Sequence, residues 1–246
     1  MGIPIKKRLL QIGLWSFIFV GLAFVMGFVA VEHRNQNCEK IHVEIDYSEG
    51  YFFVEPEDVR AMIRNDGIEL LGKPISAIDF QMLESLIANN PHVENVQVYS
   101  LISGDLKIEI SQRTPMLRLM PRSMRGFYLD KKGVRMELSK KYTARVTLAN
   151  GFIKNDMVSD LFLLATFVNN NKFWQSQLQQ IYVDSAQQIL LIPRVGRHKI
   201  ILGEVRNLEN KFSHLLAFYK DGLNKIGWNR YETIDLSYEG QIVCTK

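Results

Sequence analysis

The side chains that could carry out chemistry are few and scattered along this 246-residue chain. The five histidines show no His-x-x-x-His spacing and the cysteines form no Cys-x-x-Cys pair, so metal-ligand motifs are absent. The sequence also lacks a Gly-x-Ser-x-Gly elbow and a Gly-x-x-x-x-Gly-Lys-Ser/Thr phosphate loop. Glu55 and Glu57 stand at an expected helix start, where the helix dipole explains them. We therefore predict no catalytic residue, metal, cofactor or small-molecule substrate, and no enzyme.

Two cysteines, Cys38 and Cys244, are too few for a disulfide scaffold. Residues Asn35–Asn37 lack the small and apolar residues of a lipoprotein processing site, so we expect no lipidation at Cys38. Because connectivity cannot be deduced from sequence, a Cys38–Cys244 bridge and two free thiols both remain open.

The stretch Leu9–Val31 contains no charged residue and, as a helix, is long enough for the roughly 30 Å hydrocarbon core of a bilayer. Lys6, Lys7 and Arg8 precede it, so the positive-inside rule places residues 1–8 in the cytoplasm. We therefore predict a single-pass protein of the inner (plasma) membrane, in contact with its lipid, with the chain from Glu32 onward on the extracytoplasmic, periplasmic side.

Two other interpretations of this stretch fit less well. A cleaved signal peptide has a shorter apolar region, roughly 7–15 residues, and Phe28 stands where its cleavage site needs a small residue. A buried helix of a soluble protein would show a polar stripe, and this segment shows none.

The net charge of +4 does not indicate a nucleic-acid-binding protein. Three of the 30 basic residues belong to the N-terminal tail, which leaves 27 against 26 acidic residues in the rest of the chain. That part is nearly neutral and shows no basic stripe that could follow phosphates, so we expect no nucleic acid among the partners.

The region from residue 39 to 113 predicts the order strand–helix–helix–strand–strand. Apolar and polar residues alternate over 41–46, which is typical of a half-buried strand. A helix is expected between Glu55 and Gly67, and Asp79 should cap a second one. Strands then follow near 96–98 and 106–110, the last with one wet face. These elements predict an α+β fold in which two helices cover one face of a small sheet.

The region from residue 114 to 246 predicts a larger sheet with two helices. We expect short strands at 116–120, 127–129, 134–138, 145–148, 181–183, 189–192 and 199–202, with a hairpin turn at Asp130–Gly133. One helix should be capped by Asp156, and a longer one should span Glu204–Lys225. Its apolar stripe has core spacing, although a partner-binding stripe is the alternative. That stripe comprises Leu208, Phe212, Leu215, Leu216, Tyr219 and Leu223.

The chain ends in an expected hairpin. Gly240 suits the left-handed position of a three-residue turn, Tyr238–Gly240, which pairs Ser237 with Gln241 and Leu236 with Ile242. A two-residue turn would mix the two faces of the strands. In the favoured register the inward face is Ile234, Leu236, Ile242 and Cys244, and the outward face is Asp235, Ser237, Gln241, Val243 and Thr245.

Four phrases give the chain a family resemblance. They are Ile78-Asp79 with Leu83, then Asn90-Pro91-His92-Val93 with Val96-Gln97-Val98, then Leu106–Pro115, and the closing Tyr231–Tyr238. With the basic tail and the single apolar stretch, the chain resembles the FtsQ/DivIB family of bacterial cell-division proteins, in which a POTRA domain precedes a β domain. Ser237 stands where arginine is common in that phrase.

The resemblance implies a domain order. We expect a cytoplasmic tail at 1–8, a transmembrane helix at 9–31, a linker at 32–38, a POTRA-like domain at 39–113 and a β domain at 114–246.

The resemblance also implies a function in binding. The expected protein is a non-catalytic divisome scaffold at the division site, which links early to late septum assembly. Its partners would be FtsB/FtsL-like single-span proteins, with septal peptidoglycan synthases as further candidates. In the family a partner segment adds a strand to the edge of the last strand, as in β-augmentation. We place this site at Thr233, Asp235, Tyr238, Gln241, Val243 and Thr245.

The last strand lacks the lysine or proline residues that usually protect an edge strand from pairing, apart from the terminal Lys246. If it is the binding edge, Val243→Pro should abolish partner binding and leave the fold intact. Two other function classes stay open. One is a POTRA-bearing export or outer-membrane assembly factor that binds client polypeptides, and the other is a membrane-anchored enzyme with an unrecognised site.

Overall fold

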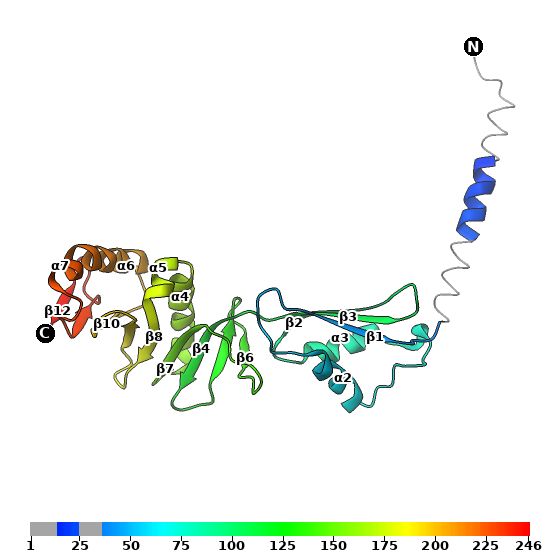
Figure 1. The fold of residues 1–246 in the computed structure, drawn as a ribbon, viewed down its shortest axis with the longest axis horizontal. Coiled ribbons are helices and arrows are strands. Elements are labelled where there is room, and N and C mark those ends of the chain that lie inside the picture. The colour runs from blue at the N-terminus through cyan, green and yellow to red at the C-terminus, as the bar shows by residue number, and fades with distance from the viewer. Residues whose placement is uncertain (1–13, 25–35) are drawn as a thin grey trace, which may run out of the picture. The chain divides into compact units, whose positions relative to one another are not determined.

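A computed structural model of the protein describes residues 14–24 and 36–246 (Figure 1). The chain divides into two compact units. Of the described residues beyond 36, the first unit holds 36–47 and 54–112, and the second holds 48–53 and 113–246. The short segment 48–53 thus belongs to the second unit, although the chain on both sides of it belongs to the first.

Residues 14–24 form a helix with exposed side chains. Within the described ranges, no helix combines the length and the apolar character that crossing a membrane requires. The predicted span Leu9–Val31 extends at both ends into residues outside the described ranges. The predicted tail 1–8 and most of the predicted linker 32–38 also lie outside those ranges.

The first unit has the predicted order of strands and helices. Its elements are β1 (Ile41–Asp46), α2 (Pro56–Asn65), the 3-10 turn η1 (Ile75–Ala77), α3 (Phe80–Ala88), β2 (Val93–Ser100) and β3 (Leu106–Gln112). The sheet order is β1-β3-β2, with β1 parallel and β2 antiparallel to β3. Both α2 and α3 lie on one side of this sheet (Figure 1), which is the predicted α+β arrangement.

The helix boundaries follow from local sequence signals. The Asp58 carboxylate accepts a hydrogen bond from the Glu55 N–H (3.0 Å) at the start of α2, and Gly67, with φ of +72°, follows its end. The Asp79 carboxylate accepts from the Met82 N–H (3.0 Å), which confirms the predicted cap of α3. The Leu83 side chain of α3 is completely buried in the core of the first unit.

Residues 36–38, which were expected in the linker, bond to the first unit. The Cys38 N–H donates to the Lys73 carbonyl (2.8 Å), and the Ile75 N–H donates to the Gln36 carbonyl (2.9 Å). The Cys38 side chain is fully buried, and burial raises the pKa of its thiol. Both cysteines are free thiols in the structure.

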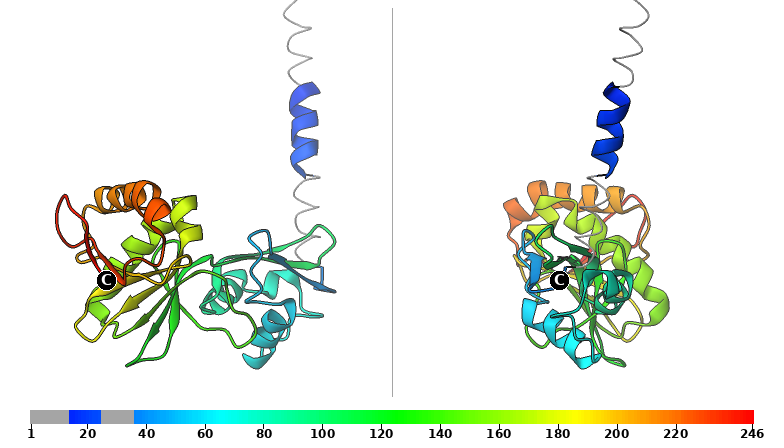
Figure 2. Two further views of the ribbon diagram at one scale, coloured as in Figure 1. Left: turned by 60° about the vertical axis from the view of Figure 1, so that its left-hand side comes forward. Right: turned by 90° about the vertical axis from the view of Figure 1, so that its right-hand side faces the viewer.

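The second unit is built on a nine-stranded mixed sheet with the order β12-β11-β10-β9-β8-β7-β4-β5-β6. Its strands are β4 (Pro115–Pro121), β5 (Phe127–Asp130), β6 (Arg135–Glu137), β7 (Thr147–Gly151), β8 (Leu178–Val183), β9 (Ile189–Pro193), β10 (Lys199–Ile201), β11 (Thr233–Asp235) and β12 (Val243–Thr245). Its helices are η2 (Asn155–Met157), α4 (Val158–Asn169), α5 (Lys172–Gln177), α6 (Leu208–Ala217), the π-helical turn η3 (Phe218–Leu223) and α7 (Asn224–Ile226). The helices gather on one side of the sheet (Figure 2).

One apolar core lies between these helices and the sheet. It joins Leu119 of β4 and Leu191 of β9 with Leu164 of α4 and Phe212 of α6, all of them buried. Within the predicted stripe of the long helix, Phe212, Leu215, Tyr219 and Leu223 are buried, and Leu208 and Leu216 pack against the core. The interpretation of this stripe as core is therefore confirmed.

Several predicted boundaries in the second unit are wrong. Asp156 lies inside the turn η2 and does not cap α4, whose N-cap position is held by Met157 without a side-chain bond. Strand β7 begins at Thr147 rather than Arg145. Helix α5 was not predicted, although the Asn171 side chain caps it by accepting from the Phe173 and Trp174 N–H groups.

The long helix begins at Leu208 and not at Glu204. Asn207 precedes it in the left-handed region (φ +51°), so the chain cannot continue as a helix toward Glu204. The N-terminal part of the predicted helix is therefore a loop, and this loop borders the candidate site described below.

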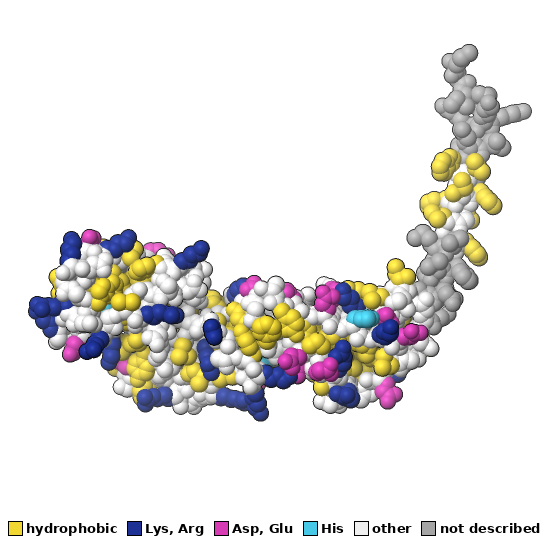
Figure 3. All heavy atoms as spheres, viewed as in Figure 1, with side chains coloured by type: hydrophobic (Ala, Val, Ile, Leu, Met, Phe, Trp, Pro, Cys, Tyr) yellow, Lys and Arg dark blue, Asp and Glu magenta, His cyan; other side chains and the backbone are white. Residues whose placement is uncertain are grey.

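The two units carry opposite net charges. Residues 36–47 and 54–112 contain 13 Asp and Glu against 5 Lys and Arg, whereas residues 48–53 and 113–246 contain 12 against 21. Many Lys and Arg side chains are visible over the second unit (Figure 3). The near-neutral total beyond the tail is thus the sum of an acidic unit and a basic one.

Candidate partner-binding edge

Strand β12 is the terminal strand of the nine-stranded sheet, and among the residues that the structure describes it pairs only with β11. The pairs are Thr233 with Thr245, Ile234 with Cys244 and Asp235 with Val243. These pairs have the register that the three-residue turn predicts, but the ladder stops at Asp235–Val243. The predicted pairs Ser237–Gln241 and Leu236–Ile242 are not formed, and residues 236–242 make a longer loop. The hydroxyls of Thr233 and Thr245 are hydrogen-bonded across the two strands.

The turn is shaped by local polar contacts and one close approach. The Asp235 carboxylate accepts from the Ser237 N–H (2.8 Å) and from the Ser237 hydroxyl (2.6 Å), which ends β11. Gly240 adopts φ of +72°, as predicted for the left-handed position. A Cβ on Gly203 would lie 2.8 Å from the Ser237 Cβ, so glycine lets the β10–α6 loop approach the hairpin closely.

The two faces of the hairpin differ as predicted. Ile234 and Leu236 are buried, and Ile242 and Cys244 pack partly buried against the core. Burial raises the pKa of the Cys244 thiol, which therefore remains protonated and inert at neutral pH. On the other side Val243 is 39% exposed. The edge strand thus combines an anchored inner face with an accessible outer face.

The backbone direction of β12 follows from its neighbours. The Leu236 N–H donates to the Ile201 carbonyl, and the Lys199 N–H donates to the Glu232 carbonyl, so even-numbered residues of β11 face β10. Odd-numbered residues of β11 therefore bond to β12, which makes Asp235–Val243 a hydrogen-bonded pair. It follows that Cys244 directs its N–H and C=O groups outward, whereas Val243 directs its own toward β11.

This geometry corrects the expected effect of Val243→Pro. Proline at residue 243 would remove a bond inside the hairpin, so we now expect this variant to lose stability as well as partner binding. The substitution that removes an outward donor is Cys244→Pro.

A groove lies between the hairpin turn and the start of α6. Its lining includes Arg206, Asn207 and Lys211 on one side and Tyr238 and Gln241 on the other. The Lys211 ammonium donates to the carbonyls of Leu202 (2.8 Å) and Glu204 (2.7 Å), which fixes the loop before α6. Burial, with the nearby Arg206 charge as a smaller cause, lowers the pKa of Lys211.

The predicted site residues separate into two groups. Thr233, Asp235, Val243 and Thr245 lie together on the two paired strands, whereas Tyr238 and Gln241 line the groove. The sequence prediction missed the groove residues of the loop and of α6, because it placed 204–207 in a helix. Asn207 was the available signal, since asparagine is typical of a helix start.

His198 is the buried histidine of the second unit, with 2% of its surface exposed. Its Nε2 is 2.9 Å from the Tyr219 hydroxyl, and the ring lies beside Trp228. Burial lowers the pKa of His198 below its ordinary 6.5, and the Trp228 backbone offsets part of that shift. This histidine contacts core aromatic rings and belongs to the core, whereas His214 of α6 is exposed.

The buried His198 predicts a pH-dependent stability. Because its folded pKa is lowered, its contribution is fully present above 6.5 and is lost as the pH falls from there through the folded pKa. We expect the free energy of unfolding to fall between pH 7 and pH 5, and His198→Gln to flatten this dependence. Urea unfolding at several pH values measures it. His214→Gln is the control and should keep the wild-type slope, and equal slopes for both variants would contradict the assignment.

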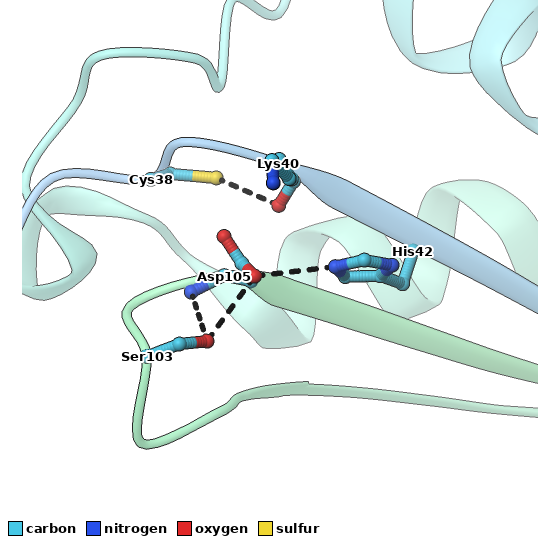
Figure 4. Close-up of polar contacts among 5 residues, drawn as sticks. All are labelled: Cys38, Lys40, His42, Ser103 and Asp105. Atoms are coloured by element: carbon cyan, nitrogen blue, oxygen red, sulfur yellow. Dashed lines mark hydrogen bonds and ion pairs between the residues drawn. The ribbon is translucent and has the colours of Figure 1, made fainter.

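A polar cluster in the first unit could be mistaken for a catalytic site (Figure 4). His42 Nε2 (3.2 Å) and the Ser103 hydroxyl (3.1 Å) both contact one carboxylate oxygen of Asp105. The His42 contact lowers the pKa of Asp105. A serine nucleophile needs its base as a direct partner, whereas here both groups bond to the acid. The cluster therefore holds the β2–β3 turn against β1. Across residues 14–24 and 36–246, no group of three His, Cys, Asp or Glu side chains is placed to hold a metal.

Comparison with known families assigns both units. Residues 36–111 match the POTRA-like domain, and residues 114–245, more than half of the chain, match the family described as FtsQ/DivIB, C-terminal related. The chain belongs to the FtsQ/DivIB family of cell-division proteins. It is similar to the cell division protein FtsQ of Geobacter sp. (strain M21), with 23% identity over 209 residues, which covers 78% of this chain and 74% of that protein.

Proposed function

We propose that this protein is a non-catalytic scaffold of the divisome, whose β12 edge accepts a strand from another division protein. The observation that carries the proposal is the position of β12 at the end of the sheet, with the backbone groups of Cys244 directed outward. An added strand would use these groups for its ladder, and the exposed side chains around Val243 would contribute specificity.

The proposed partners are single-span proteins of the FtsB/FtsL type, with septal peptidoglycan synthases as further candidates. The groove beside the hairpin supports a partner segment longer than one strand, because Tyr238 and Gln241 line it next to the end of the edge. The excess of basic residues in the second unit favours an acidic partner segment.

We further propose that Leu9–Val31 anchors the chain in the inner membrane, with residues 1–8 in the cytoplasm and both units on the far side. Membership of the FtsQ/DivIB family favours this scaffold over an export or outer-membrane assembly factor.

A depletion strain that expresses a fluorescent fusion of the full chain tests this function. We expect the fusion to gather in a ring at midcell, and depletion to give filamentous cells with an intact outer membrane. In spheroplasts, added protease should remove both units. A uniform peripheral signal combined with outer-membrane defects would support the assembly-factor function instead, and a protease-protected C-terminus would contradict the proposed orientation.

A further inference from the structure

Strand β1 is an edge strand of the first unit, and its outward backbone groups are open. The Leu106 N–H donates to the Lys40 carbonyl (2.9 Å), so the even-numbered residues around β1 bond to β3. Ile41, Val43 and Ile45 therefore direct their N–H and C=O groups away from the sheet. In the described part of the chain, no hydrogen bond reaches the outward groups of these three residues.

The opposite edge of the same sheet is different. The Glu84 carboxylate of α3 accepts a hydrogen bond from the Val98 N–H of β2 (2.8 Å). A side chain therefore occupies a backbone donor in the middle of β2, which blocks strand addition there. Of the two edges of this sheet, β1 is therefore the one whose backbone groups can bond to a further strand.

The sequence of β1 is complementary to itself in one antiparallel register. When two copies are centred on Val43, Lys40 faces Asp46 and His42 faces Glu44 across the two chains. Ile41 then faces Ile45, so the apolar side is also matched. Moving the centre by one residue places His42 opposite His42 or Glu44 opposite Glu44 across the two chains.

The apolar side of this edge continues into a groove. Ile41 lines it together with Ile63 of α2 and with Ile68, Leu70 and Leu71 of the following loop. Leu71 is 61% exposed, and Arg60 and Arg64 of α2 also line the groove. A second strand beside β1 would cover part of this apolar surface.

We propose that the first unit associates with a second copy of this chain by antiparallel pairing of the two β1 strands, centred on Val43. The pairing joins two three-stranded sheets into one of six strands around a two-fold axis. The acidic excess of the unit repels the second copy at long range, but physiological salt screens that repulsion beyond about 8 Å. The strand contacts then decide the association.

Site-directed cross-linking of the full chain in detergent micelles at physiological salt tests the register. Residues 42 and 44 of the two copies form a non-hydrogen-bonded pair, whose Cα atoms lie about 4.5 Å apart and suit a disulfide. A mixture of tagged His42→Cys and untagged Glu44→Cys chains should therefore form a mixed disulfide dimer under mild oxidation. Each variant alone should give little dimer, because the diagonal 42–42 and 44–44 distances are about 7–8 Å.

The matched control is Gln97→Cys, which is equally exposed but lies on the blocked β2 edge, and the unsubstituted chain controls for Cys38 and Cys244. A second measurement is the mass of the full chain by sedimentation equilibrium. The native chain should be dimeric, and Val43→Pro, which removes an outward donor and keeps the bonds between β1 and β3, should be monomeric with unchanged circular dichroism. A mixed pair that cross-links no better than Gln97→Cys, or a Val43→Pro chain that remains dimeric, overturns the proposal.

Discussion

Cys244→Pro is expected to weaken binding of the FtsB-like partner by about 2 kcal/mol, roughly 30-fold, while the second unit stays folded. The Cys244 N–H faces away from β11, so proline removes a donor that the added strand would use and places its ring in the path of that strand. Loss of the internal β11–β12 ladder is not expected, because the Cys244 backbone does not take part in it. Titration of the full chain in detergent with the partner measures the affinity.

Two control variants separate the edge from the fold. Cys244→Ala removes the same partly buried side chain but keeps the N–H, so it should bind as the native chain does. Val243→Pro removes the bond to Asp235, so it should lower the midpoint of thermal unfolding as well as binding. If Cys244→Pro and Cys244→Ala bind equally well, the partner does not extend the sheet at β12.

Gly151→Ala is expected to destabilise the second unit by roughly 3–5 kcal/mol, enough to leave a large unfolded fraction. Gly151 ends β7 with φ of +106°, and a Cβ there would lie 2.1 Å from the Val183 carbonyl oxygen. Because that atom is backbone of the neighbouring strand β8, relief requires movement of the sheet itself. Urea unfolding followed by the fluorescence of Trp174 and Trp228 reports on this unit.

Gly227→Ala is the control for conformational strain alone. Gly227 also has a positive φ (+98°), but a Cβ there would meet no atom within 4 Å. Its alanine variant should therefore lose only about 1 kcal/mol. Similar losses for the two variants would show that the close approach at Val183 contributes nothing beyond strain.

Much of the fold was predictable because its signals are local. Asp79 caps α3 and Gly240 takes a left-handed turn position, and both features depend on residues within a few positions. The pairing of Asp235 with Val243 was predictable for the same reason, since turn length and alternation fix a hairpin register. The sequence could not predict which residues of β12 direct their backbone groups outward. That direction depends on how β11 pairs with β10, a parallel contact between segments far apart in the chain.

The groove beside the hairpin was hidden by another nonlocal contact. Lys211 bonds to carbonyls at 202 and 204, and this holds as a loop a segment that periodicity alone assigns to a helix. The opposite net charges of the two units could not be seen in the total charge of the chain, because the acidic excess of one unit nearly cancels the basic excess of the other. Both required knowledge of which residues belong together in space.

The segment 48–53 has a consequence for cutting the protein into pieces. Phe53 packs on the rings of Tyr128 and Tyr142 (centroids 5.9 and 5.0 Å apart), and Tyr142 donates its hydroxyl proton to the Gly50 carbonyl. The backbone accordingly passes from one unit to the other at three points rather than one. A fragment that starts at residue 114 would lack the ring contacts that Phe53 makes with Tyr128 and Tyr142. The second unit therefore cannot be cut from the chain before it without losing part of its packing.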